Sequence, residues 1–209
     1  MKILETKVLI IVTFVVLFTL LGTYFTMIYP LTDKNLNTPT EFATDYTALQ
    51  LQGRNIYAKE GCVYCHTQQV RNLLFDAQRY GMGEEETFKR FNVRANVLAP
   101  PTQAGELVYD QPHLLGTRRT GPDLARVGGK YDNTWHINHL RDPRSTSPGS
   151  IMPSFTWYFD KTGQPKPELL ALVAYLQKLG TNIKWREDGV DQYKKLNGIK
   201  DDGEAQAVK

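Results

Sequence analysis

Residues 46–66 read YTALQLQGRNIYAKEGCVYCH, and this stretch decides what the rest of the chain must build around. Five of its positions follow one another at the spacing that places residues on one face of a helix. The repeating positions are Leu49, Gln52, Gly53, Ile56 and Tyr57. The segment therefore predicts a helix that leads directly into the string CVYCH at residues 62–66.

The cysteines of this string call for a chemical explanation. Cys62 and Cys65 are the only two cysteines of the chain, and His66 follows the second one directly. Two thiols three residues apart can each add to a vinyl group of one porphyrin, and the adjacent histidine can then bind the iron. The alternatives are a thioredoxin-like dithiol, which needs a βαβ context, and half of a zinc site, which needs two more ligands. The motif predicts one covalently bound haem c with His66 as an axial ligand.

A six-coordinate haem iron needs a second axial ligand. The candidates in this sequence are Met82, Met152, His113, His136 and His139. We favour Met152, which lies in SIMPSF, where Pro153 stiffens the backbone and Ile151 and Phe155 can wall the haem. His136 and His139 are three residues apart in WHINHL, but without a carboxylate or cysteine partner we interpret them as packing and surface residues.

The string Gly121-Pro122-Asp123-Leu124 reads as a tight turn. If the Pro122 carbonyl accepts a hydrogen bond from Nδ1 of His66, it fixes the orientation of the ring. The alternative interpretation is an ordinary surface turn. Three arginines nearby can pair with haem propionates or face water, and they are Arg118, Arg119 and Arg126. Gly121, Pro122 and Leu124 complete the set of candidate pocket residues.

The first thirty residues are the one strongly apolar region. Residues 8–29 contain no charge, and as a helix they would span about 33 Å, enough to cross a bilayer. Bulky residues continue to Pro30, which argues for a retained anchor rather than a cleaved signal peptide. Lys2 and Lys7 precede the span, so the positive-inside rule favours a cytoplasmic N-terminus at residues 1–7.

The rest of the chain divides by composition. Residues 30–45 are polar and predict a linker, residues 46–182 predict one domain, and residues 183–209 predict a polar tail that is mobile or bound by a partner. Within the domain we expect short helices at Glu84–Asn92 and Asn133–Leu140, and a longer one at Pro167–Leu179 that ends before Gly180. With a net charge of +3 among 209 residues, nucleic acid is not an expected partner.

These features together resemble the class I cytochrome c fold, so the expected fold is mainly α with one transmembrane helix. Gly53 would then lie where the first helix of the domain crosses the last one. The likeness is closest to the mono-haem subunit of cbb3-type cytochrome c oxidases and runs from about Tyr46 to Gly180, plus the anchor. The strings that carry it are YTALQLQGRNIYAKEGCVYCH, VYDQPHLLGTRRTGPDLARVGGKY, WHINHLRDPR, SIMPSF and LVAYLQKLG.

The resemblance implies an electron-relay subunit without a substrate-converting site of its own. Its partners would be the catalytic haem–copper subunit and a di-haem cytochrome c subunit, in a bacterial inner membrane with the haem domain on the periplasmic side. It also implies a calcium ion near Thr117. Residues 84–103 look longer than the family pattern. This departure leaves open a related nitric oxide reductase or a free-standing, membrane-tethered electron shuttle.

Overall fold

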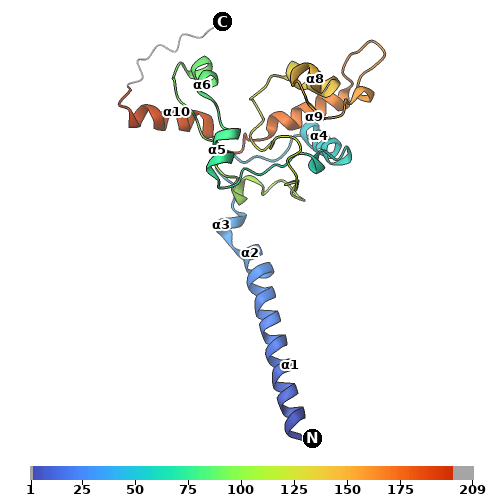
Figure 1. Cartoon of the computed structure of the whole chain (residues 1–209), viewed down its shortest axis with the longest axis vertical. Coiled ribbons are helices and arrows are strands. Elements are labelled where there is room, and N and C mark those ends of the chain that lie inside the picture. Colours follow the sequence, from blue (N-terminus) through green and yellow to red (C-terminus); the bar gives the residue numbers. More distant parts are fainter. Residues whose placement is uncertain (1, 200–209) are drawn as a thin grey trace.

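A computed structural model describes residues 2–199 as a long helical stalk that carries a helical head (Figure 1). No strand forms within this range, where only two isolated bridges occur, Met82 with Val97 and Phe159 with Pro165. The expected fold class, mainly α with one N-terminal apolar helix, is confirmed.

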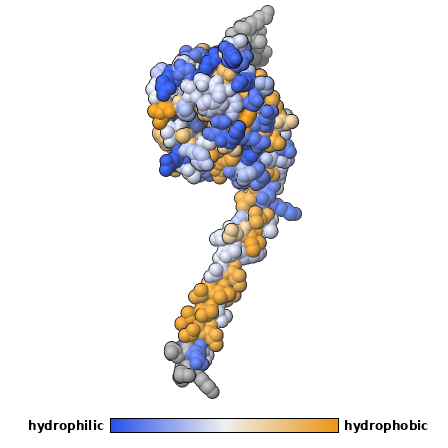
Figure 2. All heavy atoms as spheres, turned by 90° about the vertical axis from the view of Figure 1, so that its right-hand side faces the viewer, coloured by the Kyte–Doolittle hydropathy of each residue, from blue (hydrophilic) through white to orange (hydrophobic). Residues whose placement is uncertain are grey.

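The stalk is a nearly continuous rod of three helical segments. They are α1 (Lys2–Thr23), the π-helical turn η1 (Tyr24–Ile28) and α2 (Tyr29–Thr32). The apolar stretch Glu5–Thr32 is long enough to cross a membrane, and none of it is buried against the head. Figure 2 shows hydrophobic side chains along most of this rod. The wide π turn directly precedes α2, in which Pro30 supplies no backbone N–H to the ladder.

The predicted linker docks on the head. Asp33 caps the short helix α3 (Lys34–Asn37) by accepting from the backbone N–H of Asn35, and α3 contacts the 3₁₀ turn η3 (Ala104–Glu106). Thr40 then donates its backbone N–H to the Gly105 carbonyl at 3.1 Å and its hydroxyl to the Asn182 carbonyl at 2.7 Å. The segment expected to be a linker is thus held to the head at two points.

The head is organised by the crossing of α4 (Ala48–Lys59) with α9 (Pro167–Lys178). Thr47 and Gln50 form a reciprocal capping box at the start of α4. At the crossing, a Cβ on Gly53 would overlap the backbone carbonyl of Ala171. The prediction that Gly53 allows a close helix approach is confirmed, because any side chain there would strike backbone.

The first core forms around this crossing. It also includes α7 (Asn133–Arg141) and the 3₁₀ turn η4 (Thr156–Tyr158), and α8 (Pro143–Thr146) follows α7. A helix was expected at residues 133–140, and α7 confirms it. The buried members of this cluster are Ile56, Tyr57, Val127, Leu140, Phe155, Tyr158, Leu169, Ala171, Leu172, Val173, Tyr175, Leu176 and Leu179.

A second core lies beside the first and is covered by α5 (Leu74–Tyr80), α6 (Glu84–Phe91) and α10 (Trp185–Leu196). In Figure 1, α6 and α10 occupy the opposite side of the head from α8 and α9. We call this part the second lobe. Its buried residues are Val70, Tyr80, Met82, Val93, Ala95, Val97, Ala99, Ala125, Trp185 and Val190.

Helix α10 of the second lobe differs from the mobile or partner-bound tail that was expected for residues 183–209. Trp185 and Val190 are buried, and Gly189 passes so close to Val97 that a Cβ would meet its side chain. The start of the presumed tail is thus a packed helix, because three apolar residues at helical spacing, Trp185, Val190 and Tyr193, find a matching surface. Residues 200–209 lie outside the described range.

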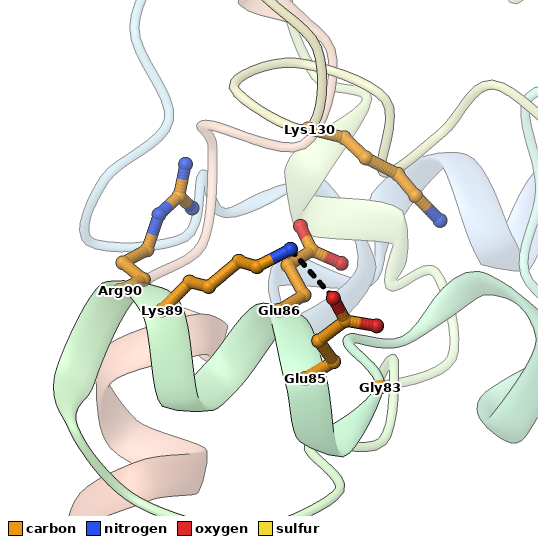
Figure 3. A pocket seen from close by; sticks show the side chains of 6 residues that line it. All are labelled: Gly83, Glu85, Glu86, Lys89, Arg90 and Lys130. Atoms are coloured by element: carbon orange, nitrogen blue, oxygen red, sulfur yellow. Dashed lines mark hydrogen bonds and ion pairs between the residues drawn. The ribbon is translucent and has the colours of Figure 1, made fainter.

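A charged depression on α6 is lined by five ionisable side chains and Gly83 (Figure 3). Its shortest ion pair joins Lys89 Nζ to Glu85 Oε1 at 2.6 Å, and both side chains are largely exposed. Exposed pairs of this kind contribute little to stability or specificity. None of its residues belongs to the candidate haem site.

Candidate haem-binding site

The two cysteines lie in a tight turn directly after α4. Gly61, with φ at 71°, ends the helix, and residues Cys62–Tyr64 form the 3₁₀ turn η2. The backbone N–H groups of Cys65 and His66 both donate to the Cys62 carbonyl, at 3.1 and 2.9 Å. Both thiols are free; Cys62 is half-buried against the first core and Cys65 is exposed. Burial raises the pKa of the Cys62 thiol to about 12.

The turn at residues 121–124 contacts the imidazole ring of His66. Its Nδ1 lies 2.7 Å from the Pro122 carbonyl oxygen, which is the first of the two alternatives that the sequence left open for this turn. A carbonyl can only accept, so Nδ1 carries the proton and Nε2 keeps the lone pair that a metal needs. Gly121 lies against the ring, where a Cβ would overlap the imidazole. Burial lowers the pKa of His66, while the Pro122 hydrogen bond and Asp123 act in the opposite direction.

Met152 contacts the same core as the cysteine turn. Its half-buried side chain packs against the first core, as do those of Cys62 and Leu124. Two hydrogen bonds fix the loop after it: Phe155 N–H donates to the Leu140 carbonyl at 2.8 Å, and the Tyr158 hydroxyl donates to Glu60 at 2.6 Å. Because Glu60 caps α4 just before Cys62, the methionine loop and the cysteine turn are tied to one frame.

The other axial candidates have different surroundings. Met82 is buried in the second core, so its sulfur is enclosed by apolar residues. His113 directs Nδ1 to the Asp110 carbonyl at 2.5 Å. His139 stacks on Trp135 and bonds Thr146 through Nδ1 at 2.6 Å. His136 is buried, and its Nε2 makes no hydrogen bond. The choice of Met152 as the second axial ligand stays a prediction.

The arginine expectations need correction. Arg126 is buried in an ion pair with Glu106, with Nη1 to Oε2 at 2.5 Å, so this guanidinium is engaged within the protein rather than open to a propionate. Arg119 is engaged with Asp76. Arg118 is exposed. Of the residues expected to wall the haem, Phe155 is buried in the first core, whereas Ile151 and Pro153 are exposed.

Sequence reasoning missed a group of buried polar residues around the histidine. Asp123, at the end of the GPD turn, accepts hydrogen bonds from Thr67 and Gln69, the residues that follow His66. The available signal was a carboxylate directly after Pro122, which could not indicate its partners. Within residues 2–199 no group of three or more His, Cys, Asp or Glu could hold a metal ion, and Thr117 is exposed.

The residues present fit a haem c. Two free thiols, a histidine with an unprotonated Nε2 and a half-buried thioether are the donor set that such a group uses. Gly121 leaves room for the ring of His66 at the place where any side chain would displace it. Fold and site together define a cytochrome c.

A comparison with known families shows which kind of cytochrome c this chain is. The model of the family described as cytochrome c oxidase, mono-heme subunit/FixO, matches residues 1–166. The chain therefore belongs to this family of oxidase subunits. It carries the family's single haem, and the apolar helix Glu5–Thr32 supports a membrane-anchored protein. No curated protein matches the chain. Helix α10 lies beyond the matched residues.

Proposed function

We propose that this subunit relays single electrons through one haem c attached at Cys62 and Cys65. Each thiol S–H adds across one vinyl C=C bond, so two thioethers form without an oxidant. The haem supplies a one-electron iron couple, with His66 and Met152 as axial ligands. The observation that carries the proposal is the 2.7 Å contact from His66 Nδ1 to Pro122, which leaves Nε2 free on the residue that directly follows Cys65.

The relay needs a donor and an acceptor. We propose that electrons come from a di-haem cytochrome c subunit and pass to the catalytic haem–copper subunit, where oxygen is reduced. The head then lies on the periplasmic side of a bacterial inner membrane, because Lys2 and Lys7 precede the span. If His66 and Met152 both bind the iron, it would have no open position for a substrate. A calcium ion near Thr117 would need ligands from the partner. We therefore propose this ion only as one that is shared with the partner subunit.

The docked linker favours a fixed subunit over a tethered shuttle. A shuttle has to swing on a flexible linker, but here α3 contacts η3 and Thr40 bonds two separate loops of the head. Asn182 ties those loops to each other through its side-chain bond to the Glu106 carbonyl at 2.7 Å. Such a clamp keeps the haem at a set position relative to the membrane helix, as transfer to a fixed neighbour requires.

Gentle purification from native membranes tests the assignment. We expect covalent haem c to travel with a chain that holds haem b and copper, visible in reduced-minus-oxidised spectra. Haem c on this chain alone would support the shuttle, and co-purification with a haem b, non-haem iron partner would support a nitric oxide reductase. A protein without haem would contradict the proposal.

The axial role of Met152 has a matched control. Met152→Leu and Met82→Leu remove the same thioether with little change in volume, one at the proposed site and one in the second core. We expect Met152→Leu to keep its haem, lose the thioether-to-ferric-iron absorption band and bind carbon monoxide when reduced. Met82→Leu should keep the wild-type spectrum. Equal spectra for both variants would exclude Met152 as a ligand.

A further inference from the structure

Backbone hydrogen bonds join the segment that carries His66 to the turn that orients its ring. Gly121 N–H donates to the Cys65 carbonyl and Leu124 N–H donates to the Thr67 carbonyl, each at 2.8 Å. The His66 contact with Pro122 lies between these two bonds. Residues 65–67 and 121–124 therefore run as a short ladder, and the ring orientation depends on how firmly this ladder is fixed.

Asp123 fixes the ladder through its side chain. Its carboxylate is fully buried and accepts three hydrogen bonds. The donors are the Thr67 hydroxyl at 2.5 Å, the Gln69 N–H at 2.8 Å and the Ala125 N–H at 2.9 Å. One carboxylate thus joins both segments of the ladder, and it contacts Thr67, the residue next to His66.

Arg119 supplies the balancing positive charge. Its Nε donates to the Thr67 hydroxyl oxygen at 2.8 Å, and its Nη2 lies 3.5 Å from the Asp123 carboxylate. The same guanidinium pairs with the fully buried Asp76 at 2.8 Å. Arg71 pairs with Asp76 from the solvent side at 3.0 Å. Two arginines and two aspartates balance, but only Arg119 and Asp123 touch the His66 segment.

We propose that Asp123 and Arg119 are positioning residues that hold the proximal histidine and set the reduction potential of the haem from opposite directions. The inference rests on the proposed attachment of haem at His66. Ferric haem carries one more positive charge than ferrous haem, so a buried negative charge nearby favours the ferric state and a positive charge favours the ferrous state. Asp123 therefore lowers the potential, and Arg119 raises it.

Three variants of the full-length protein in its complex separate this role from general loosening. Asp123→Asn keeps the shape and removes the charge, and Arg119→Gln removes the opposing charge. Arg71→Gln is the matched control, because it removes a guanidinium from the same Asp76 without touching Thr67 or Asp123. Redox titration of the haem c absorption band measures each potential.

We expect the potential to rise in Asp123→Asn, to fall in Arg119→Gln and to stay at the wild-type value in Arg71→Gln. The double variant Asp123→Asn with Arg119→Gln should return toward the wild type. Shifts of the same sign in both single variants would mean loosening of the ladder and would overturn the inference, as would unchanged potentials with haem bound.

Failure of the proposed function and failure of this inference give different results. If the wild-type chain holds no haem c, the proposed function fails, whereas haem-loaded variants with unmoved potentials reject only the roles of Asp123 and Arg119. If Asp123→Asn cannot be loaded with haem, the comparison of Arg119→Gln with Arg71→Gln decides, because loss of the Arg119 charge must by itself lower the potential. Equal potentials in that pair would overturn the inference.

Discussion

Gly53→Ala is the sharpest test of how closely the two main helices of the head cross. The new Cβ would overlap the carbonyl carbon and oxygen of Ala171 and would lie 2.9 Å from the Cβ of Tyr175. Because the obstacle is backbone, a side-chain rotation cannot relieve it and the helices must separate. Overpacking of this kind costs about 3 kcal/mol. Alanine recovers about 1 kcal/mol of helix propensity.

The net expectation is a loss of about 2 kcal/mol, which is roughly a 30-fold shift of the folding equilibrium. For a chain of this length it lowers Tm by about 4–8 °C. The assay is thermal and denaturant unfolding of the full chain in detergent, followed through the haem band and tryptophan fluorescence. Gly83→Ala is the control, since a Cβ there meets nothing within 4 Å. If Gly53→Ala were as stable as Gly83→Ala, the close crossing of α4 and α9 would be refuted.

Three further changes test the buried polar groups and the second lobe. Burial lowers the pKa of His136 to about 4, so the folded state resists its protonation and stability falls as the pH drops from about 6.5 toward 4; His136→Leu should flatten this part of the pH–stability curve. The hydrogen bonds from Arg71 and then Arg119 hold the pKa of Asp76 well below its usual value, so its stabilisation is present at neutral pH and is lost in acid below about pH 4. Asp76→Asn should cost about 3 kcal/mol at pH 7 and less at lower pH. Trp185→Ala should cost about 3 kcal/mol by opening the second core, while the haem spectrum stays unchanged.

Each of these expectations has a result that contradicts it. An unchanged pH profile in His136→Leu would mean that this imidazole already titrates normally in the folded protein. A loss in Asp76→Asn that is equal at pH 7 and pH 3 would remove charge as its cause. Denaturant titration and proteolysis of α10 measure the effect of Trp185→Ala. If the variant is as stable as the wild type, residues 185–196 are not packed on the second core.

The helices of the first core and the CVYCH turn could be predicted from sequence because their signals are local. The spacing of apolar residues marks α4 and α9, and the adjacency of Cys65 and His66 is visible without a fold. The contact of Pro122 with His66 could be named from the sequence as one alternative, because a backbone carbonyl is a common partner of a ligating histidine, but an ordinary surface turn fitted the same residues.

The errors concern features whose partners are distant in the chain. Arg126 could not be assigned from sequence, because Glu106, its buried partner, is separated from it by twenty positions of irregular chain. Helix α10 is too polar to predict a core by itself, and its apolar side chains gain meaning only opposite Val97. The polar segment 30–45 looked like a tether for the same reason, since Thr40 finds its acceptors at Gly105 and Asn182.

The crossing at Gly53 also has a consequence for the order in which the protein is made. Gly53 and Ala171, which meet there, are 118 positions apart (171 minus 53), so the head cannot close until nearly the whole chain has been synthesised. Contacts of such long sequence separation form late and slowly. Cys62 and Cys65 leave the ribosome long before α9 does, and throughout that interval they lie on open chain. Such late closure would leave both thiols accessible for the proposed attachment of haem.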